Sequence, residues 1–256
     1  MTTRLDGRTV IVTGGGSGIG RAVAETFAAS GAFVVVTGRS AAPIEAIAAR
    51  IGGLAVTCDV TRLDQVEEAF ARAARAGSGR IDVLVNNAGQ SGPVGALAEV
   101  DLDAWRDCVE VNLFGAMHCM RVAARVMGVQ HGGSIINMSS RMGLFGYPMR
   151  TAYCATKFAL IGMTEALARE VGPLGVRVNA LCPGAVSGAL MDRVIAARAE
   201  AEGRPAEEIV RRDYTDSAAL RRWLSPEEVA TAALFLASDA SSAITGERIR
   251  VDCGRS

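Results

Sequence analysis

The sequence predicts an α/β fold in which helices cover both faces of a doubly wound parallel sheet. Three observations lead to this prediction. Short apolar runs alternate with longer segments of helical periodicity along most of the 256 residues. A glycine-rich turn follows the first apolar run, and polar or glycine clusters follow several of the others. Strands that alternate with helices are typical of a parallel sheet with both faces covered.

The first half of the chain keeps this alternation without interruption. Residues 8–13 form an apolar run with the length and composition of a buried parallel strand. The glycines that follow turn the chain into a helix, which runs to Ser30 and Gly31. The next predicted elements are a strand at 33–37, a helix at 43–51, a strand at 54–58, a helix at 62–76 and a strand at 81–85.

The second half continues with longer elements. They are a helix at 101–128, a strand at 134–138, a helix at 151–171, a strand at 176–181, a helix from 225 to 237 and a last strand near 248–251. Ser225-Pro226-Glu227-Glu228 marks a helix start, because the serine can cap, proline suits the first turn and the last glutamate completes a capping box. The chain contains no repeat or linker, so residues 1–256 are predicted to form one domain.

Residues 187–224 interrupt the alternation. The segment is charged and helical up to Arg212 and less regular from Tyr214 to Trp223. An insertion directly after a strand end, with both its ends returning to the same sheet edge, is typical of a substrate lid. We favour a lid over the alternative of a solvated surface helix.

Composition excludes several classes of function. Lysine and arginine total 27, as do aspartate and glutamate, so no global field recruits nucleic acid or an anionic membrane. The chain has no compact basic motif, which disfavours a DNA-binding protein. No apolar run approaches the roughly 18 residues of a membrane-spanning helix, and the first residues do not form a signal peptide. We expect a cytoplasmic protein without nucleic-acid or membrane partners.

Cysteine and histidine give no sign of a metal site. The six cysteines are scattered without a Cys-x-x-Cys pair, and His118 and His131 are isolated. The cysteines are interpreted as small buried apolar residues in a reducing compartment. No metal is predicted.

Polar and glycine clusters follow five predicted strands. Ligands of open parallel sheets bind beyond the carboxyl ends of the strands, so these clusters should meet at one edge. They are the loop Gly14–Gly20, Asp59, the segment Asn86–Gly89, the pair Ser139-Ser140 and the segment Cys182–Gly184. A glycine turn between a strand and a helix also suits phosphate, because the backbone can approach a pyrophosphate that faces the helix N-terminus. A dinucleotide site is therefore favoured over a plain tight turn.

Tyr153 and Lys157, the only lysine of the chain, stand four residues apart in the helix predicted at 151–171. This spacing places them on one helical face. A tyrosine that transfers protons near neutrality needs its pKa of about 10 lowered by about three units, or ~4 kcal/mol. An ammonium ~4 Å away at an effective dielectric near 20 supplies roughly that much. The pair is predicted to perform general acid–base catalysis.

Taken together, these motifs resemble the short-chain dehydrogenase/reductase family, in its compact branch of roughly 250 residues. The resemblance covers essentially the whole chain and implies a Rossmann-type fold. Residues 13–20 are similar to the family's cofactor loop, and Asn86–Gly89 to the segment that stabilises its central sheet. Asn112, Ser140, Tyr153 and Lys157 fall where the family carries its catalytic tetrad.

The resemblance implies an oxidoreductase that transfers a hydride between NADP(H) or NAD(H) and a secondary alcohol or ketone. Ser140 would hold the substrate oxygen and Tyr153 would pass the proton. Lys157 would lower the pKa of the tyrosine and bind the nicotinamide ribose, while Asn112 would bend its helix and hold a water that relays protons. The alternatives are a catalytically silent dinucleotide-binding sensor or scaffold and, within the enzymes, a 3-oxoacyl thioester reductase. The family also suggests a homotetramer built partly on the helices at 101–128 and 151–171.

Cofactor binding is assigned to the sheet edge. The residues are Gly14, Ser17, Gly18, Ile19, Gly20, Arg39, Ser40, Asp59, Val60, Asn86, Ala88, Gly89, Tyr153, Lys157, Pro183, Gly184 and Val186. In NAD-type sites an acidic residue ends the second strand, whereas this chain has Gly38 followed by Arg39. An arginine can bind a 2′-phosphate through its planar fork, so NADP(H) is favoured and NAD(H) stays possible.

The chain departs from the family pattern at two places, and its arginines suggest a substrate class. Ser187 stands close to where the family carries a threonine that holds the carboxamide, and Cys253 replaces a glycine.

Arg141 follows Ser140, and Arg150 precedes Tyr153 by one helical turn. A guanidinium beside the site would suit an anionic alcohol or ketone. The alternative is that Arg150 pairs across a subunit interface or binds carbonyls of the preceding loop.

Overall fold

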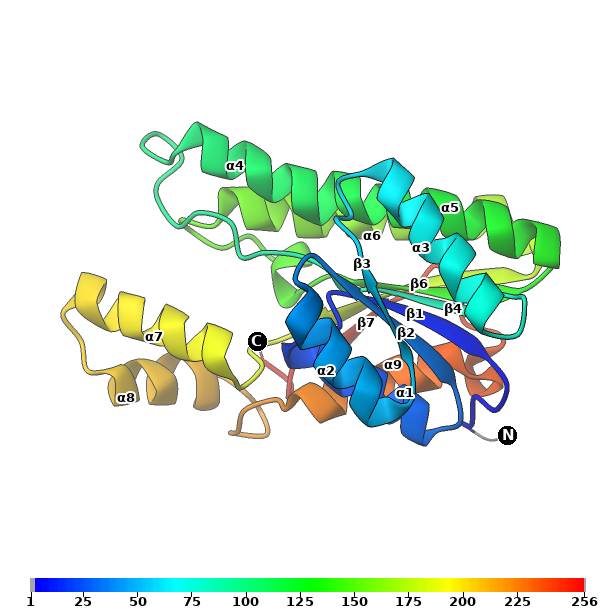
Figure 1. Ribbon diagram of the computed structural model, residues 1–256. Coiled ribbons are helices and arrows are strands. Elements are labelled where there is room, and N and C mark those ends of the chain that lie inside the picture. Colours follow the sequence, from blue (N-terminus) through cyan, green and yellow to red (C-terminus); the bar gives the residue numbers. More distant parts are fainter. Residues whose placement is uncertain (1–2, 256) are drawn as a thin grey trace.

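Seven parallel strands form one sheet in the order β3-β2-β1-β4-β5-β6-β7 in the computed structural model, which describes residues 3–255 (Figure 1). This confirms the predicted fold class. The strands are β1 (Thr9–Thr13), β2 (Phe33–Gly38), β3 (Leu54–Thr57), β4 (Val83–Asn86), β5 (Gly133–Met138), β6 (Val176–Pro183) and β7 (Arg248–Val251). The order reverses between β1 and β4, and ligands of such sheets bind in the crevice outside this switch point.

The helices alternate with the strands along the chain. The α-helices are α1 (Gly18–Ala29), α2 (Ala41–Ile51), α3 (Leu63–Ala76), α4 (Leu102–Val109), α5 (Gly115–Gln130), α6 (Thr151–Val171), α7 (Ala189–Glu202), α8 (Ala206–Ile209) and α9 (Pro226–Ala237). Two π-helical segments, η1 (Glu110–Phe114) and η4 (Val210–Thr215), and three 3-10 turns, η2 (Arg141–Gly143), η3 (Gly172–Leu174) and η5 (Asp239–Ser241), complete the described elements.

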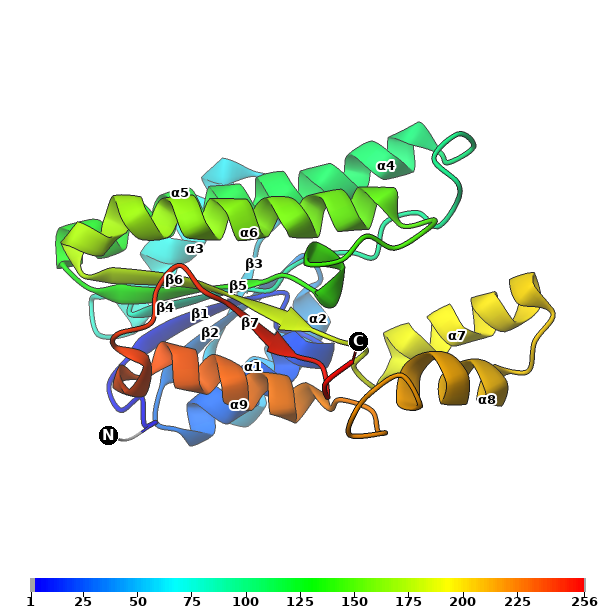
Figure 2. The same cartoon turned by 180° about the vertical axis from the view of Figure 1, so that it is seen from behind.

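Each face of the sheet has its own apolar core. Side chains of a strand alternate between the two faces, so Val10 and Val12 of β1 pack on one side while Ile11 packs on the other. Helices α1, α2 and α9 cover the first face, and α3, α5 and α6 cover the second (Figures 1 and 2). The strand residues are buried on both sides, which explains their continuous apolar runs.

The structure refines several predicted boundaries. The helix predicted at 101–128 is α4, η1 and α5 in direct succession and ends at Gln130. The strand predicted at 81–85 begins two residues later, and β6 extends to Pro183. The capping box predicted at Ser225 is confirmed, since its side chain accepts from the Glu228 amide and the Glu228 side chain accepts from the Ser225 amide.

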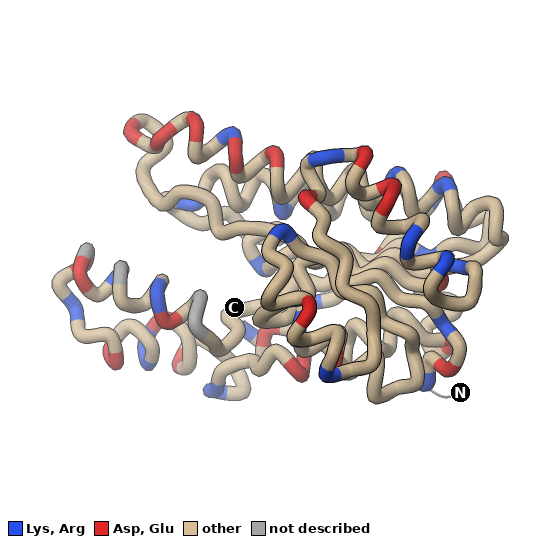
Figure 3. The backbone as a smooth tube through the Cα atoms, viewed as in Figure 1, with Lys and Arg blue, Asp and Glu red and all other residues tan. Residues whose placement is uncertain are grey.

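Residues 187–224 leave the sheet and form α7, α8 and η4, which project beyond its carboxyl edge (Figures 1 and 2). Charged residues are frequent along this projection and sparse along the central strands (Figure 3). Its two ends meet, because Val186 forms a bridge with Leu224 and the Ser187 amide donates to the Leu224 carbonyl at 2.9 Å. No helix within residues 3–255 combines the length and apolar character needed to cross a membrane.

Candidate active site

The loop between β1 and α1 leaves a helix N-terminus uncovered. Gly14 and Gly18 have positive φ angles of 64° and 52°, and a side chain on Gly20 would place its Cβ 2.3 Å from the Gly14 carbonyl oxygen. Ser17 makes no side-chain cap, and the first turn of α1 has no acidic residue. The Cβ position of Gly18 has no heavy atom within 4 Å. This cradle fits a pyrophosphate, because the amides and the helix dipole are free to face it.

The segment after β4 is bound to this loop by Thr13 and Asn87. The Thr13 hydroxyl accepts from the amides of Asn87 and Ala88, both at 2.9 Å. The Asn87 side chain donates to the carbonyls of Thr13 at 2.9 Å and Gly14 at 3.2 Å. Two residues that the sequence analysis did not select as site residues therefore fix the cradle across the switch point. The sequence pattern that could have identified Thr13 and Asn87 is a short polar residue at the end of each of two neighbouring strands.

Arg39 and Ser40 lie exposed just beyond β2, beside the segment that follows β3. Asp59 in that segment accepts from the amide and hydroxyl of Thr61 at 3.0 and 2.9 Å. Burial alone would raise the pKa of Asp59, but these hydrogen bonds and the charge of Arg39 hold it below its ordinary value. Val60 stands next in the chain, and its carbonyl contacts His118 Nδ1 at 3.0 Å. A guanidinium is thus available at the end of β2 for an anionic group.

Asn112 lies inside η1, the π-helical segment that joins α4 to α5. Its Oδ1 accepts from the Gln90 amide at 2.7 Å and its Nδ2 donates to the Gln90 carbonyl at 2.9 Å. The residue is only 1% exposed. A Cβ on Gly89 would lie 3.1 Å from Asn112 Oδ1 and 3.7 Å from Lys157 Nζ. Asn112 therefore binds the segment after β4, where Gly89 lies close to both Asn112 and Lys157. A π-turn inside a helix frequently marks a functional site.

Tyr153 and Lys157 share one face of α6, with the lysine Nζ 5.5 Å from the centre of the phenol ring. Lys157 is 5% exposed and donates to the Met138 carbonyl at 2.8 Å. Burial lowers the pKa of Lys157 to about 8. Burial also raises the pKa of Tyr153, while the Ser140 side chain and the charge of Arg150 act in the opposite direction. The predicted lowering by the lysine is therefore not observed: desolvation is the largest cause of the shift, and the opposing groups are Ser140 and Arg150.

Ser140 lies two residues beyond the end of β5 and is the N-cap of η2. Its hydroxyl accepts from the Met142 amide at 3.1 Å, so its own proton stays available to a ligand. The neighbouring Ser139 donates to the Lys157 carbonyl at 2.8 Å. A Cβ on Gly143 would lie 2.6 Å from the Lys157 carbonyl oxygen, so the turn packs directly against α6. Ser139, which belongs to a cluster selected from the sequence, and Gly143, which was not selected, fix the position of Ser140 relative to α6.

The two arginines selected from the sequence occupy different surroundings. The Arg150 guanidinium lies over the ring of Tyr153, 5.1 Å from its centre, and donates to the Ser91 carbonyl at 2.8 Å. Arg141 turns away from this pair and stacks on Phe145 at 4.9 Å. Arg150 thus contacts the acid–base residue and the loop carbonyl, whereas Arg141 faces the segment 187–224.

Pro183 and Gly184 bring the end of β6 to the same edge. The Gly184 amide donates to the Val251 carbonyl at 2.9 Å, and a Cβ on Gly184 would lie 2.8 Å from that of Asp252. Val186 follows, at the start of the projecting segment. Cys253, which replaces a glycine of the family pattern, has a positive φ of 57°. Of the five strands whose ends were predicted to meet, β1, β4, β5 and β6 are consecutive in the sheet, and β2 lies between them and β3. No group of three or more metal-binding side chains occurs among residues 3–255.

Comparisons with known proteins agree with this arrangement. A family model described as enoyl-(acyl carrier protein) reductase matches residues 14–256. The chain is 38% identical to 2,5-dichloro-2,5-cyclohexadiene-1,4-diol dehydrogenase of Sphingobium indicum, over 98% of this chain and 97% of that protein. It is 35% identical to 3-oxoacyl-[acyl-carrier-protein] reductase of Thermotoga maritima, over 98% of each. The structure of NAD⁺-bound xylitol dehydrogenase superposes with a TM-score of 0.92 at 29% identity, covering 97% of this chain and 99% of that one.

Proposed function

The chain belongs to the short-chain dehydrogenase/reductase family, and from this premise we propose how it oxidises secondary alcohols or reduces ketones. The enzyme depends on a nicotinamide dinucleotide, which supplies or accepts the hydride when bound. The protein itself contributes binding, orientation and proton transfer. The observation that carries the assignment is the grouping of Ser140, Tyr153 and Lys157 at the carboxyl edge of the sheet, with Asn112 behind them.

Tyr153 transfers the proton, and Ser140, Lys157 and Asn112 support this transfer. In reduction the phenol donates its proton to the substrate oxygen, and in oxidation the phenolate accepts it. The Ser140 hydroxyl donates to the same oxygen and holds it against the tyrosine. Lys157 provides a buried positive charge, and its link to the Met138 carbonyl keeps the Nζ in place. Asn112 holds a water that relays protons through Lys157.

The dinucleotide lies along the cradle at the switch point. Gly14, Ser17, Gly18, Ile19 and Gly20 hold the pyrophosphate, and Asp59, Val60, Asn86, Ala88 and Gly89 line the neighbouring strand ends. Tyr153 and Lys157 bind the nicotinamide half, together with Pro183, Gly184 and Val186. NADP(H) is the favoured form, because Arg39 and Ser40 replace the acidic residue expected at the end of β2 in an NAD site.

Residues 187–224 act as a lid on one domain that spans residues 1–256. The Val186–Leu224 bridge supports this role, since it fixes both ends of the segment beside the site. Phe114 and Phe158 are 43% and 45% exposed and lie on the α4–α5 and α6 helices, which suits a homotetramer that buries them. The six free cysteines suit the reducing cytoplasm.

Absorbance of the dihydronicotinamide tests the proposal. Purified protein is mixed with NADPH or NADH and a panel of ketones that includes a 3-oxoacyl thioester, and the reverse assay uses diols and secondary alcohols. We expect turnover of at least one neutral member of the panel. Cofactor binding without turnover on any member would contradict the proposal and indicate a silent sensor, an alternative that the named dehydrogenase relatives do not favour.

A further inference from the structure

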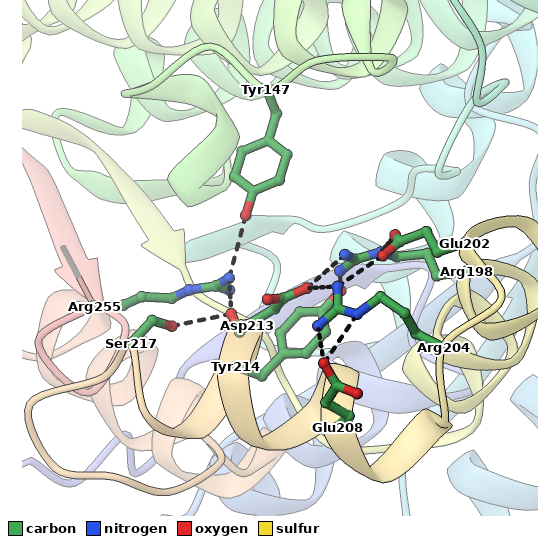
Figure 4. Close-up of polar contacts among 9 residues, drawn as sticks. All are labelled: Tyr147, Arg198, Glu202, Arg204, Glu208, Asp213, Tyr214, Ser217 and Arg255. Atoms are coloured by element: carbon green, nitrogen blue, oxygen red, sulfur yellow. Dashed lines mark hydrogen bonds and ion pairs between the residues drawn. The ribbon is translucent and has the colours of Figure 1, made fainter.

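A pocket of about 400 Å³ lies between the loop that precedes α6 and the lid. Arg141 and Tyr147 line it from the loop, Arg198, Arg212 and Asp213 from the lid, and Arg255 from the C-terminal segment. Figure 4 shows Tyr147 pointing onto Arg255, while Asp213 and Arg198 approach from the other side. A volume of this size falls within the range of small-molecule sites.

The charge of this pocket is unbalanced. Its lining includes four guanidinium groups and one carboxylate. That carboxylate, Asp213, already pairs with Arg198 at 2.6 Å and lies 3.6 Å from Arg204. No ion pair within residues 3–255 includes Arg141, Arg212 or Arg255. Three of the four guanidinium groups at this cavity therefore form no ion pair within the described part of the chain.

Arg255 is the most buried of these groups, at 8% exposed. Its Nη2 donates to the Tyr147 hydroxyl at 3.2 Å and to the Asp213 carbonyl. These partners are neutral, and the other guanidinium nitrogens have no partner among the described residues. An anion in the pocket would give this guanidinium a charged partner.

Arg141, on the side of the pocket nearer to Ser140 in the chain, also favours an anion in the pocket. It follows Ser140, stacks on Phe145, and its Nε lies 3.4 Å from the Arg255 carbonyl. Burial lowers the pKa of Arg141, and the positive charge of Arg255 lowers it further. Two guanidinium groups that repel each other at one cavity are both stabilised by an anion between them. The planar fork of each group matches a carboxylate or a phosphate.

We propose that this pocket binds an anionic group, a carboxylate or a phosphate, of the substrate whose carbonyl or alcohol carbon lies at Ser140 and Tyr153. The inference rests on the proposed function. It assigns the anion to Arg141, Arg212 and Arg255, and it leaves Arg150 to act on Tyr153. Tyr147 lines the pocket from the loop that joins Ser140 to α6.

The lid offers a matched pair of variants. Arg211 and Arg212 are adjacent, both exposed, and neither forms an ion pair within residues 3–255. Only Arg212 lines the pocket. Arg212→Met and Arg211→Met therefore remove the same charge from the same segment, and neither removes a buried contact. Arg141→Met is expected to have a larger effect, because Arg141 directly follows Ser140. Arg255→Met carries the greater risk to folding, because Arg255 is the most buried of these arginines.

The experiment compares an acidic ketone with its neutral methyl ester in the wild type and the three variants. We expect Arg141→Met to lower kcat/KM for the acid about 10- to 100-fold, Arg212→Met to lower it several-fold, and both to leave the ester nearly unchanged. Arg211→Met should change neither substrate. Wild-type KM for the acid should rise with ionic strength. Equal losses on acid and ester, or equal effects of Arg211→Met and Arg212→Met, would overturn the proposal.

Inorganic phosphate separates a substrate subsite from a regulatory anion site. We expect phosphate to inhibit turnover of the acid competitively, with a weaker effect in Arg212→Met. Inhibition that is not competitive, or activation of ester turnover, would mean that the anion does not belong to the substrate and would overturn the proposal. Calorimetric titration of the acid into each variant needs no turnover. Loss of acid binding in Arg141→Met, with binding retained in Arg211→Met, would support the anion site even if the proposed oxidoreductase activity were not found.

Discussion

The catalytic edge and the lid pocket hold their side chains in different ways. At the catalytic edge, Asn112, Ser139 and Lys157 are buried and bond to backbone atoms of neighbouring elements. In the lid pocket, arginines bond to carboxylates, a phenol and carbonyls of segments far apart in the chain. The lid ion pairs are also more solvated, with Arg198 and Asp213 side chains 29% and 23% exposed.

This difference indicates a division of tasks. Bonds to the backbone of a sheet edge fix distances before any ligand arrives, which suits proton transfer. Ion pairs among long side chains can rearrange around different anions and are weakened by salt, which suits substrate selection. The variants below test whether changes at each region affect chemistry, affinity or stability as this division requires.

The largest effect within this series is expected from Lys157→Met. Activity should fall more than about 100-fold, because the buried charge beside Tyr153 is lost. At pH 7 the free energy of unfolding should rise by about 1–3 kcal/mol, since the wild type keeps a desolvated ammonium with a pKa near 8. Chemical denaturation and steady-state kinetics measure both quantities.

The stability gain of Lys157→Met should depend on pH. Unfolded Lys157 binds its proton up to a pKa near 10.4, whereas the folded one releases it near 8. Between these values the unfolded state holds more protons, so wild-type stability rises with pH and the difference between the proteins shrinks. Arg248→Met, which removes an exposed pair with Glu165, is the control and should change stability by less than about 1 kcal/mol. A gain that does not vary from pH 7 to 10 would contradict the buried-charge account.

Arg39→Ala tests the cofactor preference apart from the chemistry. Loss of one charge-assisted contact should weaken NADPH binding about tenfold and leave NADH binding nearly unchanged. Fluorescence titration measures both without turnover. Arg50→Ala, at another exposed arginine, on α2, should leave both affinities as they are. A wild type that binds NADH more tightly, with no change in Arg39→Ala, rules out the NADP assignment.

Arg150→Met tests whether this arginine acts through the tyrosine. Its charge lowers the pKa of Tyr153, so removing it should shift the alkaline rise of the alcohol oxidation rate upward by about half a unit to one unit. Oxidation needs the phenolate, and the variant reaches it only at higher pH. Arg106→Met on α4, which removes an exposed pair with Asp103, is the control. A lower rate with an unshifted profile would show that Arg150 supports only the loop at Ser91.

Cys253→Gly is expected to have the smallest effect and to change neither catalysis nor substrate binding in the lid pocket. A Cβ at φ 57° is strained, and the relief should outweigh the added freedom of the unfolded chain. The free energy of unfolding should rise by about 0.5–1 kcal/mol. Cys253→Ala keeps the Cβ and should give no gain. Equal gains in both variants would point to packing of the thiol instead of backbone strain.

The sequence predicted one region much better than the other. The succession of strands and helices along the chain and the polar strand ends follow from local patterns, because apolar runs, glycines and caps determine structure within a few residues. The spacing of Tyr153 and Lys157 likewise needed only a helix. The raised pKa of Tyr153 was not predictable, since it depends on burial by segments distant in the sequence. The arginine pocket joins residues near 141, 147, 212 and 255, and no local pattern indicates that they meet.

The central claim is that Tyr153 performs the proton transfer at a fixed edge, whereas the lid pocket only selects substrate. Tyr153→Phe and Tyr147→Phe remove one hydroxyl from each region, and their kcat values on a neutral secondary alcohol test this claim most directly. We expect Tyr153→Phe to abolish turnover with cofactor binding retained, and Tyr147→Phe to keep most of it. A Tyr153→Phe protein that kept more than about a tenth of the wild-type rate, a loss below ~1.4 kcal/mol, would contradict the account.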